Sequence, residues 1–555
     1  MKHLLKQYFG YDEFRPLQEE IVNHVVSGKD CFVLMPTGGG KSLCYQLPAL
    51  KFDGITVVVS PLISLMKDQV DALRACGIKA ELINSTLAPM QIDKICLSAK
   101  NGEVKILYIA PERFALKDFQ EFLKTLTVSL VVVDEAHCIS EWGHDFRPSY
   151  RNLSLLKELF PSTPLMALTA TATRQVREDI INQLQLQKAR VFISSFNREN
   201  LHIRVIEKKQ ASPKLVNILQ KYRDESVIIY CFSRKETEMV AENLKLKKFN
   251  VRAYHAGMDP GERTLVQDLF IKDEVNIIVA TIAFGMGIDK PDVRLVVHYT
   301  YPKTLEGYYQ EIGRAGRDGL ASECVMFYTY ADTRKHEFFI NQIEDEKLRS
   351  RAHKKLNLVS NYAKLATCRK KYLLNYFGEE LTGTTCRGCD ICCPTKNLAG
   401  SGASFEAIQA KDELGYNREL FERLRALRRK LAYEANVPPF VVFADTALRE
   451  MSHYLPLNSE DFSNITGVGA KKLEQYGASF LSIINSFARE KDIAPGDLSR
   501  KKHGQSRARK GISGFHLKTK DLLAKKMPIF MIAHYCPSDI PCNSSCSHDW
   551  VFSST

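Results

Sequence analysis

Short runs of valine, isoleucine and leucine alternate with amphipathic stretches along the first two thirds of the chain. Short apolar runs bounded by turns are typical of buried parallel strands, and the stretches between them have helical spacing. The alternation therefore predicts α/β domains in which helices cover both faces of a parallel sheet. The runs lie at 55–59, 104–109, 130–133 and 165–168 in a first cycle, and at 227–230, 275–280 and 295–298 in a second.

Beyond this alternation the pattern becomes purely helical. Leu420 and Leu424 belong to a leucine repeat at helical spacing, and Pro438-Pro439 is expected to start another helix. The glycine turn at 465–469 either binds a phosphate through its backbone amides or simply joins two packed helices. The expected divisions are two doubly wound domains at 1–195 and 196–340, a zinc-binding helical module at 341–394, a small-residue linker at 395–415, an all-α domain at 416–490 and a basic tail at 491–555.

A glycine-rich segment directly after an apolar run predicts a phosphate-binding loop. It reads Met-Pro-Thr-Gly-Gly-Gly-Lys-Ser at 35–42. Its backbone N–H groups can surround the β- and γ-phosphates of a nucleotide, Lys41 adds a positive charge, and the Ser42 hydroxyl can bind Mg²⁺. The nucleotide ligands expected here are Thr37, Gly38, Gly39, Gly40, Lys41 and Ser42.

Two carboxylates complete the hydrolytic chemistry. Asp134 and Glu135 follow the apolar run 130–133 directly. Asp134 is placed to hold the metal ion, and Glu135 is placed to orient and deprotonate the attacking water. The phosphate loop followed by Asp-Glu-Ala-His predicts a nucleic-acid-dependent ATPase that uses ATP and Mg²⁺.

Further candidates flank these two motifs. Arg15 and Gln18 precede the phosphate loop, where Gln18 can pair bidentately with adenine or instead belong to a helix cap. In the second domain Arg314 and Arg317 are three residues apart and face the same way on a helical turn. If the domains close on ATP, we expect Arg317 to reach the γ-phosphate, and Arg314 to orient it or pair with a carboxylate.

Further motifs lie at 9–18, 38–42, 60–66, 169–172, 283–290 and 309–319. In the identity and order of these motifs, the chain resembles the RecQ family of superfamily 2 DNA helicases over residues 1–394. The resemblance implies two tandem RecA-like domains, Tyr11 stacked on adenine, and a 3′ to 5′ polarity. It also implies catalytic roles for His137 and Gln310 and a nucleotide contact for Asp289.

An aromatic segment follows the two carboxylates without a break. Trp142 and Phe146 offer ring faces and Arg147 a cation, a combination that stacks on unpaired bases and holds their phosphates. A Trp-Phe packing patch is the alternative. In RecQ helicases the corresponding loop couples single-strand binding to ATP hydrolysis.

Four cysteines predict a structural Zn²⁺ site. The sequence Cys386-x2-Cys389-x2-Cys392 follows Cys368 along the chain, and four thiolates can close a tetrahedral site with no open position. Cys393 is the alternative fourth ligand. RecQ proteins carry a zinc-binding subdomain with this pattern.

One domain that RecQ proteins usually carry is not found in the sequence. RecQ proteins usually place a winged-helix domain, whose β-hairpin splits the duplex, after the zinc site, and 394–415 is too short to hold one. We expect a 3′ to 5′ helicase that acts on single-stranded and forked DNA in repair and recombination, with single-strand-binding or recombination proteins as possible partners. The alternatives are a DNA-stimulated ATPase that remodels complexes without strand separation, and a DNA-tethering protein that acts through its C-terminal modules.

The composition predicts a soluble protein. The 555 residues are 45% hydrophobic, yet no apolar stretch is long enough to span a membrane, so we expect a cytoplasmic location, associated with the nucleoid if the source is bacterial, and no membrane partner. Of the net charge of +13, most lies at 500–526, which suits contact with phosphates or simply aids solubility. Most of the fifteen cysteines occur singly in apolar segments and are expected to be reduced; Cys536, Cys542, Cys546 and His548 are candidates for a second metal site.

Overall fold

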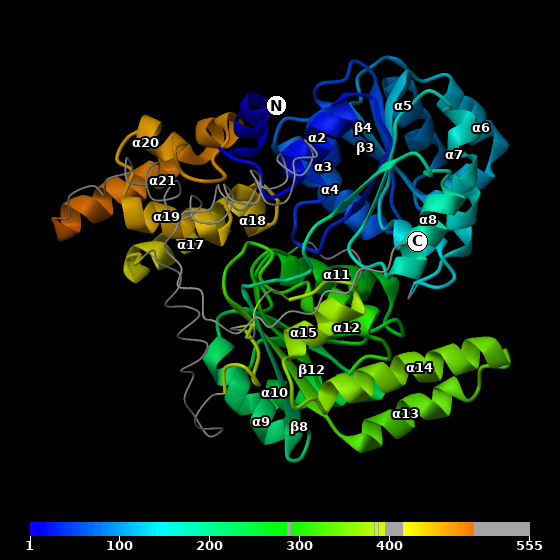
Figure 1. Cartoon of the computed structure of the whole chain (residues 1–555). Coiled ribbons are helices and arrows are strands. Elements are labelled where there is room, and N and C mark those ends of the chain that lie inside the picture. The colour runs from blue at the N-terminus through cyan, green and yellow to red at the C-terminus, as the bar shows by residue number, and fades with distance from the viewer. Residues whose placement is uncertain are drawn as a thin grey trace, which may run out of the picture. The chain divides into compact units, whose positions relative to one another are not determined.

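The first domain is built on a parallel sheet of seven strands (Figure 1). The computed structural model describes residues 1–492 except 144, 286–289, 382, 384, 387 and 395–414. Every strand pair in the sheet is parallel, and the strand order is β3-β4-β2-β5-β6-β1-β7. The strands are β1 (Cys31–Leu34), β2 (Ile55–Val59), β3 (Ala80–Ile83), β4 (Ile106–Ile109), β5 (Val128–Val133), β6 (Leu165–Thr169) and β7 (Arg190–Ile193).

Helices cover both faces of this sheet, because parallel strands need crossover connections. β6 separates β1 from β5, and because all the strands are parallel their carboxyl ends lie along the one edge of the sheet where such sheets bind ligands. The helices are α1 (Lys2–Leu4), η1 (Leu5–Phe9), α2 (Gln18–Val26), α3 (Leu43–Ala49), α4 (Ile63–Ala75), α5 (Pro89–Lys100), η2 (Pro111–Ala115), α6 (Lys117–Lys124), η3 (Ala136–Ile139), η4 (Pro148–Leu155), α7 (Leu156–Leu159) and α8 (Arg174–Gln183).

The second domain repeats the plan with six parallel strands in the order β10-β11-β9-β12-β13-β8. The expectation of two doubly wound parallel sheets is confirmed. Its strands are β8 (Leu201–Glu207), β9 (Ser226–Tyr230), β10 (Val251–Tyr254), β11 (Ile277–Ala280), β12 (Val293–His298) and β13 (Ser322–Tyr328), and its helices are α9 (Ala211–Leu219), η5 (Gln220–Tyr222), α10 (Arg234–Leu246), α11 (Pro260–Ile271) and α12 (Leu305–Ile312).

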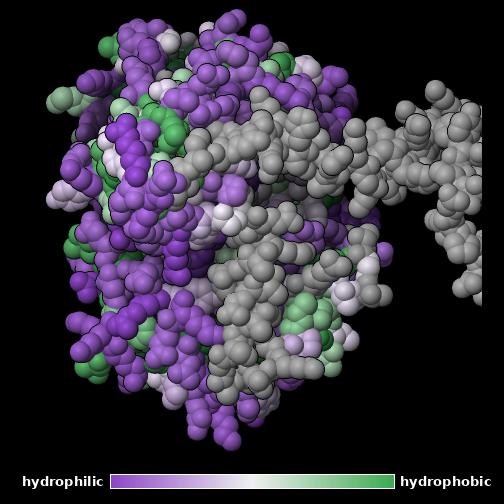
Figure 2. Space-filling view, turned by 90° about the vertical axis from the view of Figure 1, so that its left-hand side faces the viewer, coloured by the Kyte–Doolittle hydropathy of each residue, from purple (hydrophilic) through white to green (hydrophobic). Residues whose placement is uncertain are grey.

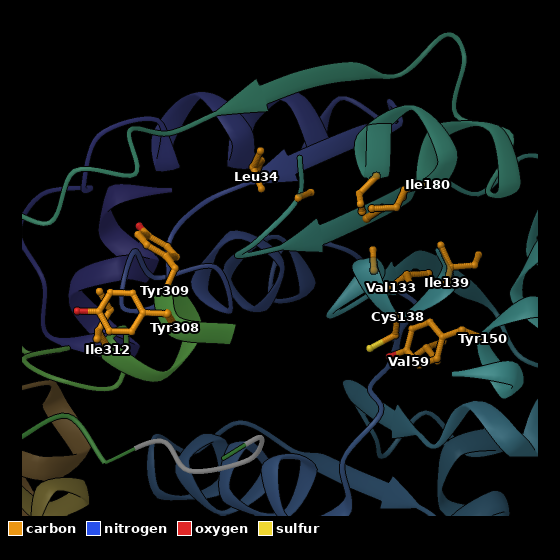
Figure 3. Packing of buried hydrophobic residues seen from close by; sticks show 14 of the residues in the cluster. Leu34, Val59, Val133, Cys138, Ile139, Tyr150, Ile180, Tyr308, Tyr309 and Ile312 are labelled. Carbon is orange, nitrogen blue, oxygen red and sulfur yellow. The ribbon is translucent and has the colours of Figure 1, made fainter. Parts of the chain in front are cut away.

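Apolar packing is continuous from the first domain into the second. Leu34, Val59 and Val133 come from β1, β2 and β5, and they belong to the same buried cluster as Tyr309 and Ile312 of α12 (Figure 3). Because the expected arginine motif follows α12 directly, this shared core helps to hold that motif against the first domain.

Helices make up the remainder of the described chain. Leu420 and Leu424 are fully buried and the helix predicted at Pro439 begins there, so the all-α expectation is confirmed. The helices are α13 (Tyr330–Ile340), α14 (Glu346–Ala363) and α15 (Arg369–Tyr376) beside the second sheet, then α17 (Arg418–Glu434), α18 (Pro439–Val442), α19 (Asp445–Tyr454), α20 (Ser459–Ser463) and α21 (Ala470–Lys491).

The face shown in Figure 2 is largely hydrophilic, with its hydrophobic side chains in small separate groups. Within the described residues, no helix combines the length and the apolar composition that crossing a bilayer requires.

Candidate active site

The phosphate loop leaves the end of β1 and leads into α3. Gly38 and Gly40 take positive φ angles of 78° and 83°. The left-handed backbone at Gly40 favours glycine, and a Cβ there would also displace the Gln18 amide, whose Nε2 would lie 2.3 Å away. The Lys41 ammonium donates to the carbonyl of Met35 at 3.2 Å, which holds it inside the loop.

Gln18 braces this loop from behind. Its Nε2 donates to the carbonyl of Gly40 at 3.1 Å, and its Oε1 accepts from the backbone N–H of Arg15 at 2.9 Å. The Arg15 guanidinium donates to the carbonyl of Gly38. Both side chains line the same cavity as Tyr11, but the Gln18 amide already bonds the loop, so recognition of adenine by Gln18 stays a prediction.

The two carboxylates stand at the end of β5, beside the loop. Glu135 has a φ of 46°, a left-handed conformation that costs a non-glycine residue free energy and is concentrated at functional sites. Its N–H donates to Oδ1 of Asp134 at 2.9 Å. Burial and the neighbouring Glu135 raise the pKa of Asp134 to about 7, although Lys41 opposes the shift. A bound cation would offset both causes, so this carboxyl suits a metal ligand.

His137 connects the carboxylates to the next strand. Its Nδ1 lies 2.8 Å from the hydroxyl of Thr169, at the end of β6, and 3.2 Å from Oε2 of Glu135. The ring is fully buried. The ring therefore lies between the Glu135 carboxylate, after β5, and Thr169 at the end of β6.

The second domain contributes Arg314 and Arg317 to the cavity that the phosphate loop and the carboxylates line. Arg314 and Arg317 follow α12 and, with Gln310, line a cavity of about 540 Å³ that also contains Lys41 and Glu135. The two domains meet closely, because a Cβ at Gly38 would lie 3.3 Å from the Cα of Arg317. Arg314 hydrogen-bonds the Tyr230 hydroxyl, so its pairing with a carboxylate stays a prediction.

Arg198 is a site residue that the motifs did not reveal. It lies between the two sheets, and its guanidinium donates to the carbonyl of Thr37 at 2.6 Å and to those of Ala315 and Gly316 at 3.0 and 2.7 Å. One side chain thus joins the phosphate loop to the segment that carries Arg317. Burial lowers the pKa of Arg198, and its neighbours Arg317 and Arg15 act in the same direction. The only signal in the sequence is an arginine between two domains.

The C-terminal helical domain forms one wall of the same cavity. Thr466 lines it together with Tyr11, and the N–H of Gly467 donates to the carbonyl of Gly10 at 2.9 Å. A Cβ at Gly10 would lie 2.6 Å from the backbone of Gly467. The glycine turn therefore uses its Gly467 amide for packing, which favours the packing interpretation over phosphate binding.

The aromatic segment lies next to the carboxylates, and arginines cover its rings. Trp142 is 38% exposed, and the Arg351 guanidinium lies 3.6 Å from its ring centroid. Arg151 lies 5.1 Å from the Phe146 ring. Arg147 donates to Asp145 at 3.1 Å and to the carbonyl of Pro61 at 2.8 Å, which anchors the segment to the first domain.

The four predicted cysteines converge. The sulfur atoms of Cys368, Cys386, Cys389 and Cys392 all lie within 4.8 Å of one another, as a tetrahedral site with Zn–S bonds of about 2.3 Å requires. Cys393 is not a member of this group within the described chain. The Cys386 thiol and nearby backbone N–H groups lower the pKa of Cys389, which favours the thiolate that a metal binds.

Several sequence predictions concern residues outside those that the structure describes. They are Asp289, the linker at 395–414, and the tail from 493 onward with Cys536, Cys542, Cys546 and His548.

Four family profiles match the chain in the order of its domains. They are the DEAD/DEAH box helicase at residues 15–180, the helicase conserved C-terminal domain at 208–319, the RecQ zinc-binding domain at 330–393 and the HRDC domain at 417–484.

Curated relatives extend the similarity across most of the chain. The ATP-dependent DNA helicase RecQ of Bacillus subtilis is 38% identical over 586 aligned positions, covering 88% of this chain and 99% of the relative. The protein of the same name from Haemophilus influenzae is 37% identical and covers 87% and 95%. An alignment of 586 positions exceeds the entire 555-residue chain, so the Bacillus protein carries sequence that has no counterpart here.

Among solved structures, the chain is similar to the DUF1998 helicase MrfA bound to DNA. The TM-score is 0.50 at 20% identity, and the match covers 68% of this chain and 58% of that one. At this identity the match supports the fold alone.

Proposed function

Because this chain belongs to the RecQ family of ATP-dependent DNA helicases, we propose that it moves 3′ to 5′ along single-stranded DNA and unwinds duplexes with a 3′ overhang, in repair and recombination. The observation that carries the proposal is the shared cavity in which Lys41, Glu135 and Arg317 face one another from two domains. Opening and closing of that cavity during hydrolysis would convert ATP turnover into movement along a strand.

Each side chain has a distinct chemical role in this proposal. Lys41 leaves the Met35 carbonyl and neutralises the β- and γ-phosphates, while the loop N–H groups hold their oxygens. Glu135, oriented by His137, accepts a proton from the attacking water. Arg317 stabilises charge on the transferred γ-phosphoryl group, and Arg198 fixes its distance from the loop.

The residues present fit the two metals. Ser42 and Asp134 offer the oxygen ligands that Mg²⁺ prefers, and the ion would neutralise charge on the phosphates. The four cysteines would hold Zn²⁺ as a structural ion.

Two substitutions test the hydrolytic assignment. We expect Lys41→Ala and Glu135→Gln to lower DNA-stimulated hydrolysis by about 10²–10⁴-fold, because one removes the phosphate clamp and the other the general base. Glu135→Gln should still bind a fluorescent ATP analogue. Glu112→Gln, at an exposed position, is the matched control. Hydrolysis above a tenth of the wild-type rate in both variants would contradict the assignment.

A second candidate function is a DNA-stimulated ATPase that remodels complexes without efficient strand separation. Two observations favour it: 394–415 is too short for a winged-helix domain, and the Bacillus relative carries sequence absent here. ATPase and unwinding should be measured together on blunt duplexes and on forks with 3′ or 5′ tails. Unwinding only with a 3′ tail supports the first proposal, whereas full ATPase stimulation without unwinding supports the second.

A further inference from the structure

The aromatic loop of the first domain is held by a helix that follows the second. Lys355 of α14 donates to the backbone carbonyl of Trp142 at 3.3 Å. One turn earlier on α14, Arg351 covers the Trp142 ring at 3.6 Å. A guanidinium this close to the ring leaves no space for a base on that face. Arg351 and an unpaired base would therefore compete for that face of the ring.

Lys355 makes a second interaction on its other side. Its Nζ lies 3.1 Å from Oε1 of Glu306, whose side chain is only 5% exposed. A carboxylate buried to this extent needs a cation or donor, because an unpaired buried charge is costly. Burial opposes the charged form of Glu306, yet Lys355 and further hydrogen bonds, including one from Tyr376, keep its pKa below the usual value.

Glu306 lies in the first turn of the helix that leads to the nucleotide. Thr304 caps α12 by accepting from the N–H of Gly307, and the helix runs through Gln310 before Arg314 and Arg317. With a rise of about 1.5 Å per residue, a shift at Glu306 is passed rigidly over about 9 Å to the end of α12, and Arg314 and Arg317 lie in the turn that follows. Lys355 therefore touches the aromatic loop and the start of the helix that leads to the two arginines.

We propose that Lys355 is a positioning residue that couples the aromatic loop, through α12, to the two arginines that follow this helix. When a nucleotide occupies the site, α12 and Glu306 move. Lys355 moves with Glu306, and this changes the contacts that Lys355 and Arg351 of α14 make with Trp142. By thermodynamic reciprocity, a base that displaces Arg351 from Trp142 shifts Lys355 and Glu306 toward the arrangement that favours bound nucleotide. This inference rests on the proposed function, because it assumes that the cavity binds ATP and the loop binds single strands.

Intrinsic fluorescence reads the coupling directly. The chain contains two tryptophans, Trp142 and Trp550, so Trp550→Phe leaves Trp142 as the sole emitter. In that background we expect a non-hydrolysable ATP analogue with Mg²⁺, added without DNA, to change Trp142 emission. Lys355→Met should reduce the change at least about fivefold, in line with ordinary coupling free energies. Lys354→Met, at the exposed neighbouring position, is the matched control and should respond like the parent.

Binding of a fluorescent ATP analogue, measured separately, distinguishes failure of the proposed function from failure of the coupling role of Lys355. If the parent does not bind it, the proposed function fails. If parent and Lys355→Met bind it equally and Trp142 responds equally in both, the coupling role of Lys355 is wrong. It is also wrong if the parent binds the analogue and its Trp142 emission does not change.

Turnover gives a second readout. We expect Lys355→Met to lose most of the stimulation of ATPase kcat by single-stranded DNA, and Lys355→Arg, which keeps the charge, to recover it. If Lys355 were merely structural, its replacement would lower the basal and the DNA-stimulated ATPase rates together. Lys355→Met and Lys355→Arg would then give the same fluorescence response. Equal stimulation in Lys355→Met and the parent would overturn the inference.

Discussion

The two C-terminal modules are attached to the helicase domains in different ways. The zinc module continues the second domain: Ile203 of β8 forms a parallel bridge with Cys389, and Phe377 stacks on Phe196 with centroids 4.7 Å apart inside the shared apolar core. The helical domain instead packs its apolar side chains on one another, among them Phe443 and Phe480.

Polar groups join the helical domain to its neighbours. Arg428 lies 3.8 Å from Asp273 of the second domain, and Lys471 donates to the carbonyl of Arg74 in the first at 3.1 Å. Apolar burial is non-directional and hard to reverse, whereas an exposed hydrogen bond such as that of Lys471 can be exchanged for water at small net cost. The buried Arg428–Asp273 pair opposes release until both groups are hydrated. We infer that the zinc module is a fixed part of the folded unit and that the helical domain can be released without unfolding.

Removing a zinc ligand should have the largest effect. We expect Cys389→Ser to give insoluble or unfolded protein, because metal-binding energy is folding energy in a small module and this residue also forms the bridge to β8. The parent should contain one zinc per chain by metal analysis. Cys393→Ser is the control and should keep its zinc. Less than half an equivalent in fresh parent protein would contradict the four-cysteine site, and two equivalents would support a second site in the tail.

Removing a buried cation from the helical domain should have the next largest effect. Arg428 is fully buried and donates to Asp445 at 2.7 Å and to the carbonyl of Phe443 at 2.9 Å. Arg428→Ala removes the hydrogen-bonded cation of the buried Asp445 but leaves Arg425 and Arg294 nearby, so we expect a cost of about 3 kcal/mol, the lower end for a broken buried pair. We expect an early unfolding transition by calorimetry with zinc content unchanged. The exposed Arg429→Ala is the control. A single transition that falls as a whole would show that the two modules unfold together.

The motifs could be predicted because each is local. The phosphate loop and the carboxylate pair are contiguous runs whose spacing alone fixes their geometry, and the structure brings both into one cavity. Arg198 and Lys355 could not be predicted, because their partners are distant along the chain: Thr37 and Gly316 for the first, Trp142 and Glu306 for the second. Neither side chain stands in a pattern that distinguishes it from an ordinary surface cation.

Gly10 also has a role in packing that the sequence did not predict. The resemblance implies that Tyr11 stacks on adenine, and Tyr11 does line the cavity. The positive φ of Gly10 and its close approach to Gly467 also dock the helical domain, and this role depends on tertiary packing that no local pattern encodes.

A change at Gly10 should release the helical domain with an intermediate effect. A Cβ there would lie 2.6 Å from the Gly467 backbone, and φ is 72°. Gly28 has a φ of 75° with nothing within 4 Å of a built Cβ, so Gly28→Ala carries the same backbone strain without the collision. By X-ray scattering we expect Gly10→Ala, and not Gly28→Ala, to increase the radius of gyration. Equal radii in both variants would mean that the packing of Gly10 on Gly467 does not hold the domain.

The smallest effect should come from the basic tail, because we expect its charges to act on DNA only through long-range attraction and counterion release. The segment 500–526 holds ten Lys or Arg and one acid. We expect deletion of 493–555 to leave DNA-stimulated ATPase intact and to weaken single-strand binding most at low salt. The slope of log affinity against log salt should fall by about 0.7 for each DNA phosphate that the tail no longer neutralises. A full-length variant in which Lys501, Lys502, Arg507, Arg509 and Lys510 are changed to Gln is the matched control, because it removes charge without changing chain length. If both variants bind with the affinity and the slope of the parent, the charge of the tail serves solubility alone.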